Sequence, residues 1–234
     1  MCTVVVSWAA SEPVRVLALR DELTTRAFDD PGAWWPEQPS AIGGRDRTAG
    51  GTWCASDVTT GLTALVLNRP QKRLADEGAP SRGVLPLLAL RHGLVWPEHL
   101  ALDGMASFAL VLVGPESLTT WVYDGDGLTR SDLAPGTHLV TSGGAEDGKA
   151  ERYLSRFMAA DRPEDWRAIV QGEQPRDDLA ALVVRHEVPA EGSDPGQLVY
   201  ATVFGQLIDS VPGRLSLEHS RRPWGDQPWA RAVF

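Results

Sequence analysis

The sequence predicts an α+β protein with two antiparallel sheets sandwiched between helical layers. Within residues 2–22 and within residues 51–68, two short runs rich in β-branched residues flank a turn, which is typical of antiparallel hairpins. Helical segments fall into two separate blocks, at residues 83–102 and 145–185. Two blocks of helices suit a helical layer on each side of a pair of sheets. No linker, repeat or low-complexity segment divides the 234 residues, so we expect a single domain over residues 1–234.

The first hairpin is the element around which the chain is organised. Apolar runs at residues 2–8 and 14–19 surround the polar break at residues 11–13. With a turn near residue 11, antiparallel pairing places Cys2 opposite Leu19 or Arg20. A thiol, a guanidinium and the carboxylate of Asp21 then converge at one end of the hairpin.

These three side chains suggest nucleophilic chemistry. Met1 before a small residue is usually removed, which would give Cys2 a free α-amine as well as its thiol. An α-amine has a pKa of about 7.7–8.0 and can act as the general base for its own side chain. Arg20 would favour the thiolate, and Asp21 would orient the amine or Arg20. The alternative is that Cys2 is a small strand residue and residues 20–22 form a solvated loop.

A second hairpin follows a loop at residues 29–36 and a glycine-rich turn at residues 41–53. Its strands, residues 51–56 and 61–68, place Asn68 across from Gly50. A side-chain amide beside the backbone amides of Gly50 and Gly51 suits an oxyanion hole. The alternative is that Asn68 caps a strand end. We expect Cys54 to be a small core residue.

The remaining elements are marked by caps and turns. Ser81 is a helix N-cap, Pro163 suits a first helical turn, and the Asp-Gly repeat at 124–127 is a hairpin turn rather than a calcium loop. We expect helices at residues 83–92, 97–102, 145–160 and 177–185, and a further helix that begins at residue 163. Strands are expected at residues 107–113, 118–124, 128–133, 137–142, 198–208 and 214–218. Loops are expected at residues 71–80, 171–176 and 189–196, and an irregular tail at residues 221–234.

Composition excludes several classes of function. A net charge of −9 argues against binding of nucleic acid or anionic membranes. Two cysteines give no disulfide framework and no signal peptide is evident, so we expect a cytoplasmic protein. No apolar run of 18 residues exists, so we expect no membrane span. The nine tryptophans are expected mainly in the core, with a flat apolar ligand as the alternative. Nothing in the sequence sets an oligomeric state.

Several motifs resemble those of the NRDE family, also called the transport and Golgi organisation protein 2 family. The segment Leu19–Glu22 stands where that family has Asn-Arg-Asp-Glu, and Ser142 stands where it has a second asparagine. The other matching motifs are Met1-Cys2, Gly44-Arg45-Asp46, Ala49-Gly50-Gly51-Thr52-Trp53, Asn68-Arg69 and Ser81-Arg82-Gly83.

The resemblance implies a four-layer αββα fold similar to N-terminal nucleophile hydrolases. It implies Cys2, Arg20, Asp21 and Asn68 as catalytic residues, and Gly50, Gly51, Arg69 and Arg82 as substrate-binding residues, without a metal or cofactor. The expected function is hydrolysis of a C–N amide or an acyl (thioester) bond of a small molecule. The alternative is a non-enzymatic protein that binds or traffics haem, lipid or acyl-coenzyme A, in line with the family's links to lipid homeostasis, haem mobilisation and the secretory pathway.

Overall fold

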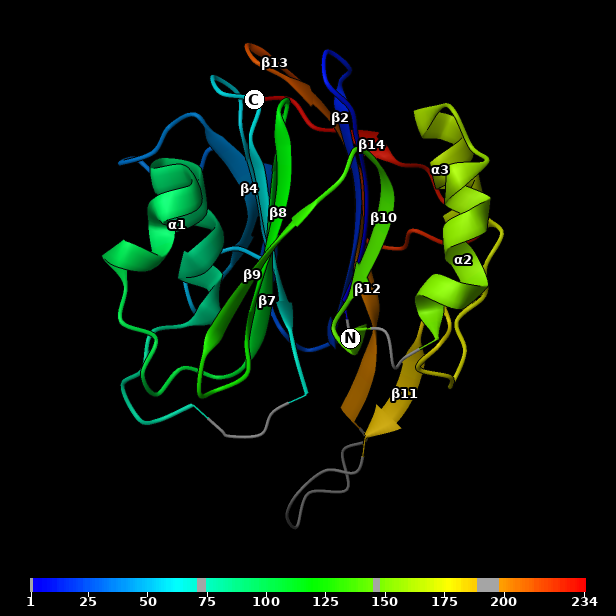
Figure 1. Ribbon diagram of the computed structural model, residues 1–234. Coiled ribbons are helices and arrows are strands. Elements are labelled where there is room, and N and C mark those ends of the chain that lie inside the picture. Colours follow the sequence, from blue (N-terminus) through cyan, green and yellow to red (C-terminus); the bar gives the residue numbers. More distant parts are fainter. Residues whose placement is uncertain (1, 71–74, 145–147, 189–197) are drawn as a thin grey trace.

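The computed structural model describes residues 2–70, 75–144, 148–188 and 198–234. These residues form two antiparallel sheets and three α-helices, which confirms the predicted α+β class (Figure 1). The helices are α1 (Leu85–His92), α2 (Lys149–Met158) and α3 (Pro163–Gln171), and two 3-10 helices, η1 (Arg82–Val84) and η2 (Gly93–His99), flank α1.

The first sheet contains the N-terminal hairpin at its centre. Its strand order is β10-β1-β2-β12-β13-β14, and β11 also pairs with β12. Its strands are β1 (Thr3–Trp8), β2 (Val14–Leu23), β10 (Gly136–Thr141), β11 (Arg185–Val188), β12 (Leu198–Val211), β13 (Arg214–Ser220) and β14 (Ala230–Arg231).

The second sheet pairs its strands in chain order, from β3 to β9. Its strands are β3 (Phe28–Gly32), β4 (Ala41–Asp46), β5 (Cys54–Asp57), β6 (Thr63–Asn68), β7 (Phe108–Gly114), β8 (Ser117–Tyr123) and β9 (Leu128–Leu133). The predicted second hairpin is therefore confirmed by the pairing of β5 with β6, and the predicted strands at 107–113, 118–124 and 128–133 are confirmed as β7, β8 and β9, which pair in chain order.

Three apolar clusters show how the elements pack. One joins the facing sides of the two sheets, with Val4 and Val16 from the first sheet and Leu65 from the second. A second lies between α1 and the β3–β9 sheet, and a third joins α2 and α3 to the other side of the β1–β2 hairpin (Figure 1). Strands β1 and β2 are thus buried on both faces, which explains why their sequences are nearly continuous apolar runs rather than alternating ones.

The predicted register of the first hairpin is confirmed. Thr3 pairs with Leu19 and Val4 with Ala18. The same register continued by one residue brings Cys2 opposite Arg20. Because side chains alternate along a strand, Arg20 shares a face with Ala18, toward the second sheet, whereas Asp21 shares a face with Leu19, toward the helices.

The predicted helix at residues 177–185 is wrong. The carboxylate of Asp178 accepts a hydrogen bond from the backbone N–H of Ala180, which closes a turn, and the chain then becomes extended. Residues 182–184 are fully buried, and Val184 exchanges hydrogen bonds with Thr202 of β12. β-branched residues favour such extended pairing over a helix.

Strands β3 and β4 occur where a loop and a turn were predicted, and the two-residue strand β14 lies in the tail that was predicted to be irregular. Strand β3 contains Pro31 but lies at the edge of its sheet, with a register shift between Asp29 and Gly32, and an edge with a bulge is where a strand tolerates proline. Strand β4 includes Gly43, where an added Cβ would lie 2.4 Å from the Cys54 carbonyl oxygen, so glycine there serves close strand contact rather than a turn.

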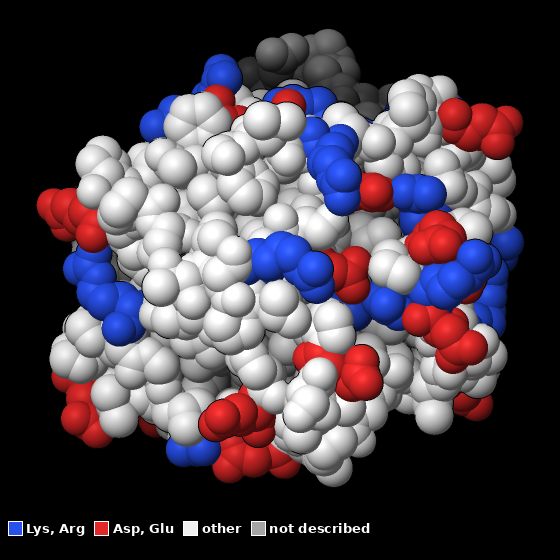
Figure 2. Space-filling model, turned by 90° about the horizontal axis from the view of Figure 1, so that it is seen from above, with Lys and Arg blue, Asp and Glu red and all other residues white. Residues whose placement is uncertain are grey.

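Some expectations fall outside the described residues, namely the first residues of the loop at 71–80, the start of the helix at 145–160, and the loop at 189–196. In the parts of the chain that are described, no helix combines the length and apolar character needed to cross a bilayer. On the face seen from above, basic and acidic side chains lie beside one another without forming a continuous patch of one sign (Figure 2).

Candidate active site

A pocket of about 120 Å³ lies where the beginning of β1, the end of β2, the end of β6 and η1 come together. It is lined by Cys2, Arg20, Asp21, Glu22, Arg26, Asp46, Ala49, Thr52, Trp53, Val66, Asn68, Ser81, Arg82 and Gly83. All four predicted catalytic residues therefore line one pocket, although they are up to 66 positions apart in the sequence. Its volume suits a small reacting group rather than a whole drug-sized ligand.

Cys2 is held by Ser142 on its backbone and by β2 on its side chain. The Cys2 backbone N–H donates to Ser142 Oγ at 2.8 Å, and the Ser142 backbone N–H donates to the Cys2 carbonyl at 3.2 Å. The thiol Sγ lies 3.9 Å from the Asp21 carbonyl oxygen, to which it donates. Ser142 therefore contacts the nitrogen that becomes the α-amine when Met1 is removed.

The surroundings of the Cys2 thiol favour its protonated form. Burial raises the pKa of Cys2, the Asp21 carboxylate raises it further, and the N-terminal charge, the hydrogen bond to Asp21 and Arg20 oppose this shift. A protonated thiol is a weak nucleophile, so the site needs a base to activate it. No histidine is among the described residues that line the pocket.

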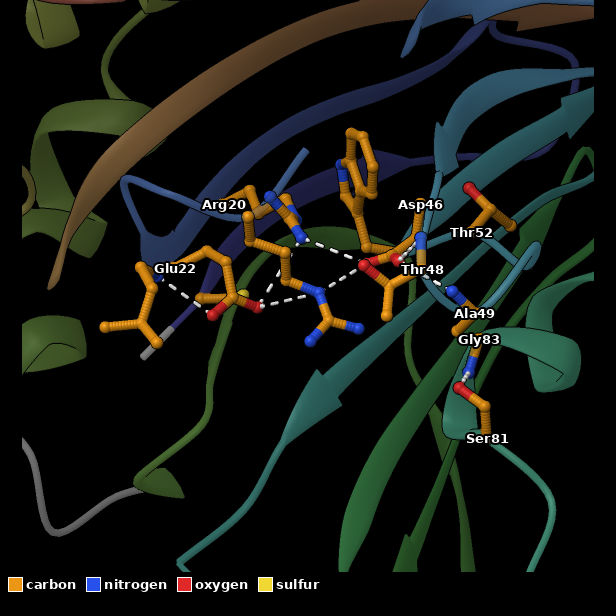
Figure 3. A network of polar contacts seen from close by, with 12 residues as sticks. Arg20, Glu22, Asp46, Thr48, Ala49, Thr52, Ser81 and Gly83 are labelled. Carbon is orange, nitrogen blue, oxygen red and sulfur yellow. Dashed lines mark hydrogen bonds and ion pairs between the residues drawn. The ribbon is translucent and has the colours of Figure 1, made fainter. Parts of the chain in front are cut away.

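Arg20 is fixed between acidic and aromatic side chains (Figure 3). Its Nη2 lies 3.5 Å from Glu22 Oε2 and 3.4 Å from Asp46 Oδ2, and its guanidinium carbon lies 4.5 Å from the centre of the Trp53 ring. Arg26 shares both carboxylates and approaches Asp46 to 2.6 Å. The Asp46 carboxylate also accepts hydrogen bonds from the backbone of residues 48 and 49, so its loop is tied to the same network.

Asp21 points away from this network, into a buried polar cluster. Its Oδ1 accepts a hydrogen bond from Thr202 Oγ1 at 2.6 Å, and its Oδ2 lies 3.7 Å from Lys149 Nζ. Lys149 is fully buried and donates to Thr3 Oγ1 at 2.9 Å. The Asp21 carboxylate and Lys149 therefore connect Thr3, the residue that follows Cys2, to helix α2 and strand β12.

The predicted substrate-binding residues divide between the pocket and its surroundings. Arg82 lines the pocket and donates to the Ser107 carbonyl at 2.8 Å. Arg69 instead lines a neighbouring pocket of about 290 Å³ beside β10. The Gly50 N–H donates to the Asp46 carbonyl, and a Cβ added to Gly51 would lie 2.4 Å from the Gly83 backbone. The two glycines thus shape the loop behind the pocket.

Sequence reasoning missed Lys149, Thr3 and Thr202. A lysine at the start of an amphipathic helix carries no signal of burial, and its partner Asp21 is 128 positions away. Glu22, Asp46 and Trp53 were within matched motifs, but their role around Arg20 depends on the contact between the two sheets.

Comparison with protein families identifies one match. Residues 1–192 match the family described as Transport and Golgi organisation 2. The chain belongs to this family. The match includes the whole pocket, Ser142 and Lys149, and it ends before β12, which supplies Thr202. A comparison with curated proteins gives no significant match.

Proposed function

We propose that this member of the Transport and Golgi organisation 2 family is a cysteine hydrolase of the N-terminal nucleophile type, with the four-layer αββα arrangement of that class. The observation that carries the proposal is the pair of contacts at Cys2. Its backbone nitrogen is held by Ser142 Oγ at 2.8 Å, and Cys2 lines a pocket together with Arg20 and Asn68. The three apolar clusters support the layering, since they join helix to sheet, sheet to sheet, and sheet to helix.

The α-amine of Cys2 supplies the missing base. After removal of Met1 it is neutral in a useful fraction of molecules near pH 8, and it takes the thiol proton directly or through a water. The sulfur then attacks the carbonyl carbon of an amide or thioester. The Ser142 hydroxyl accepts from the amine, so it orients the nitrogen lone pair relative to the thiol.

Asn68 is the proposed oxyanion donor. It ends β6 on the pocket wall, and its side-chain amide is an N–H donor for the oxygen that becomes negative. Neither Gly50 nor Gly51 lines the pocket, and the Gly50 N–H is used by Asp46, so Asn68 is the one donor that we assign. When the intermediate collapses, the leaving amine or thiol of the substrate departs with the proton that the Cys2 α-amine had taken. Water then hydrolyses the thioester that remains on Cys2.

A panel of small amides and thioesters tests the proposal. Cys2→Ala should reduce turnover by about 10³-fold or more, as loss of a nucleophile does in other hydrolases. Cys54→Ala is the matched control, because Cys54 is buried between the sheets and does not line the pocket. Turnover that survives Cys2→Ala would refute the proposed nucleophile.

A second candidate function is non-enzymatic binding of haem, a lipid or an acyl chain. A separate pocket of about 390 Å³, lined by Trp35, Leu87 and Leu88 among others, favours it, because this volume is in the range of ligand sites. The carrier function predicts ligand binding that Cys2→Ala leaves unchanged and that Leu88→Arg weakens.

A further inference from the structure

Three basic and three acidic side chains line the Cys2 pocket, and five of these six have an oppositely charged partner among the described residues. Among the described lining residues, Arg20 and Arg26 share the carboxylates of Glu22 and Asp46, with separations of 2.6–3.8 Å. The fifth charge, Asp21, is directed at the buried Lys149 and Thr202 instead. These two arginines and three carboxylates are therefore matched by partners within the protein.

Arg82 is the cation that remains. Its guanidinium donates to a neutral acceptor, the Ser107 carbonyl, at 2.8 Å, and within the described residues it has no carboxylate within 4.0 Å. Burial lowers the pKa of Arg82, and the nearby Cys2 sulfur, when it is ionised, and the Glu22 carboxylate oppose this shift. Arginine stays charged in proteins, so a half-buried positive charge is left beside the nucleophile.

Arg20 offers a second donor. Its side chain is 5 % exposed, and its Nη1 atom is buried without a hydrogen-bond partner among the residues that the structure describes. Such atoms are uncommon in folded proteins, and leaving one unsatisfied is unfavourable. A ligand acceptor in the pocket would satisfy it.

We propose that the pocket selects substrates with an anionic group, such as a carboxylate, close to the carbon attacked by Cys2, and that Arg82 is the counter-ion. This rests on the proposed role of Cys2 as the nucleophile. A carboxylate fits Arg82 better than a neutral amide because a guanidinium presents paired N–H donors to both of its oxygens. The pocket volume of about 120 Å³ limits the group to a few heavy atoms near the sulfur.

Two alkylating reagents of nearly equal size test the charge preference. Iodoacetate carries a carboxylate, and iodoacetamide has a neutral amide in its place. In both reactions the Cys2 sulfur forms a bond to the CH₂ carbon as the carbon–iodine bond breaks; iodide leaves, and the thiol proton goes to the α-amine or to water. The rate at Cys2 is followed by peptide mass mapping, which separates it from Cys54, and is divided by the rate of the neutral thiol N-acetylcysteinamide.

The expected result is that iodoacetate is favoured at Cys2 by about tenfold after this normalisation, the factor for one charge-assisted hydrogen bond. Arg82→Gln should remove this preference and Arg82→Lys should keep part of it. Arg91→Gln is the matched control, because Arg91 also donates to a backbone carbonyl but does not line the pocket. The preference should also shrink as salt is raised.

Three results would overturn the inference. Equal normalised rates for the two reagents in the unmodified protein would do so while leaving Cys2 as the nucleophile. An equal loss of both rates in Arg82→Gln would mean that Arg82 stabilises the thiolate rather than a substrate anion. No labelling of Cys2 by either reagent would overturn this inference and the proposed nucleophile together.

Discussion

Replacing Lys149 by methionine should destabilise the protein strongly. The Lys149 and Asp21 side chains are both fully buried and their charged atoms are 3.7 Å apart. Removing one partner of a buried ion pair costs about 3–5 kcal/mol, because the other charge is left without compensation. Asp21 keeps its hydrogen bond from Thr202, so we expect a loss near the lower figure, about 3 kcal/mol. For a domain of this size that lowers the Tm by roughly 6–12 °C.

The assay is urea unfolding of Lys149→Met beside two further variants. Arg152→Met is the control on the same helix, since Arg152 and Asp178 form an exposed pair with side chains 44 % and 41 % exposed, and it should leave the unfolding midpoint almost unchanged. Adding Asp21→Asn to Lys149→Met removes the buried charge that has lost its lysine and should recover part of the loss. The reasoning is refuted if Lys149→Met unfolds at the same urea concentration as Arg152→Met, or if the double variant is less stable than Lys149→Met.

Three other predictions concern the site. Ser142→Ala should slow turnover about tenfold, since the Cys2 nitrogen loses its acceptor, whereas Ser142→Thr should keep most of the rate; equal rates for both would contradict the orienting role. Gly51→Ala should lower the free energy of unfolding by about 1–3 kcal/mol, because the added Cβ would lie 2.4 Å from the Gly83 backbone. A Cβ added at Gly127 has no neighbour within 4 Å among the described residues, so Gly127→Ala should leave the stability unchanged. Similar unfolding midpoints for the two variants would refute the packing argument. Burial and Asp21 raise the Cys2 pKa above its ordinary value of 9.0, and the thiolate is the reactive form, so alkylation of protein that retains Met1 should accelerate only above pH 9.0. Alkylation of protein that lacks Met1 should accelerate from about pH 8, where the α-amine becomes neutral. Identical pH profiles for the two forms would argue against the α-amine as the base.

The sequence was most informative where local rules decide structure. The first hairpin followed from a polar break between two apolar runs, and its register placed Cys2 opposite Leu19 or Arg20, of which the observed pairing selects Arg20. The same alternation rule places Arg20 and Asp21 on opposite faces. A register alone does not tell which face meets the second sheet, so the separate partners of these two residues needed the tertiary structure.

The errors occurred where long-range contacts override local signals. Residues 177–185 contain good helix formers, but residues 182–184 are buried in an extended segment in which Val184 hydrogen-bonds Thr202 of β12. Pro31 and Gly43 were interpreted as loop and turn residues, yet one lies in an edge strand and the other allows two strands to approach closely. Lys149 was missed for the same reason, since its burial depends on residues from β1, β2 and β12.

The most direct test of Cys2 as a self-activating nucleophile is the intact mass of the purified protein before and after a pulse with small acyl substrates. The proposal predicts a chain that lacks Met1, and an acyl adduct that maps to Cys2 and is absent from Cys2→Ala. A chain that retains Met1 in its active form would contradict the role of the α-amine, and an adduct that persists in Cys2→Ala would contradict the nucleophile itself.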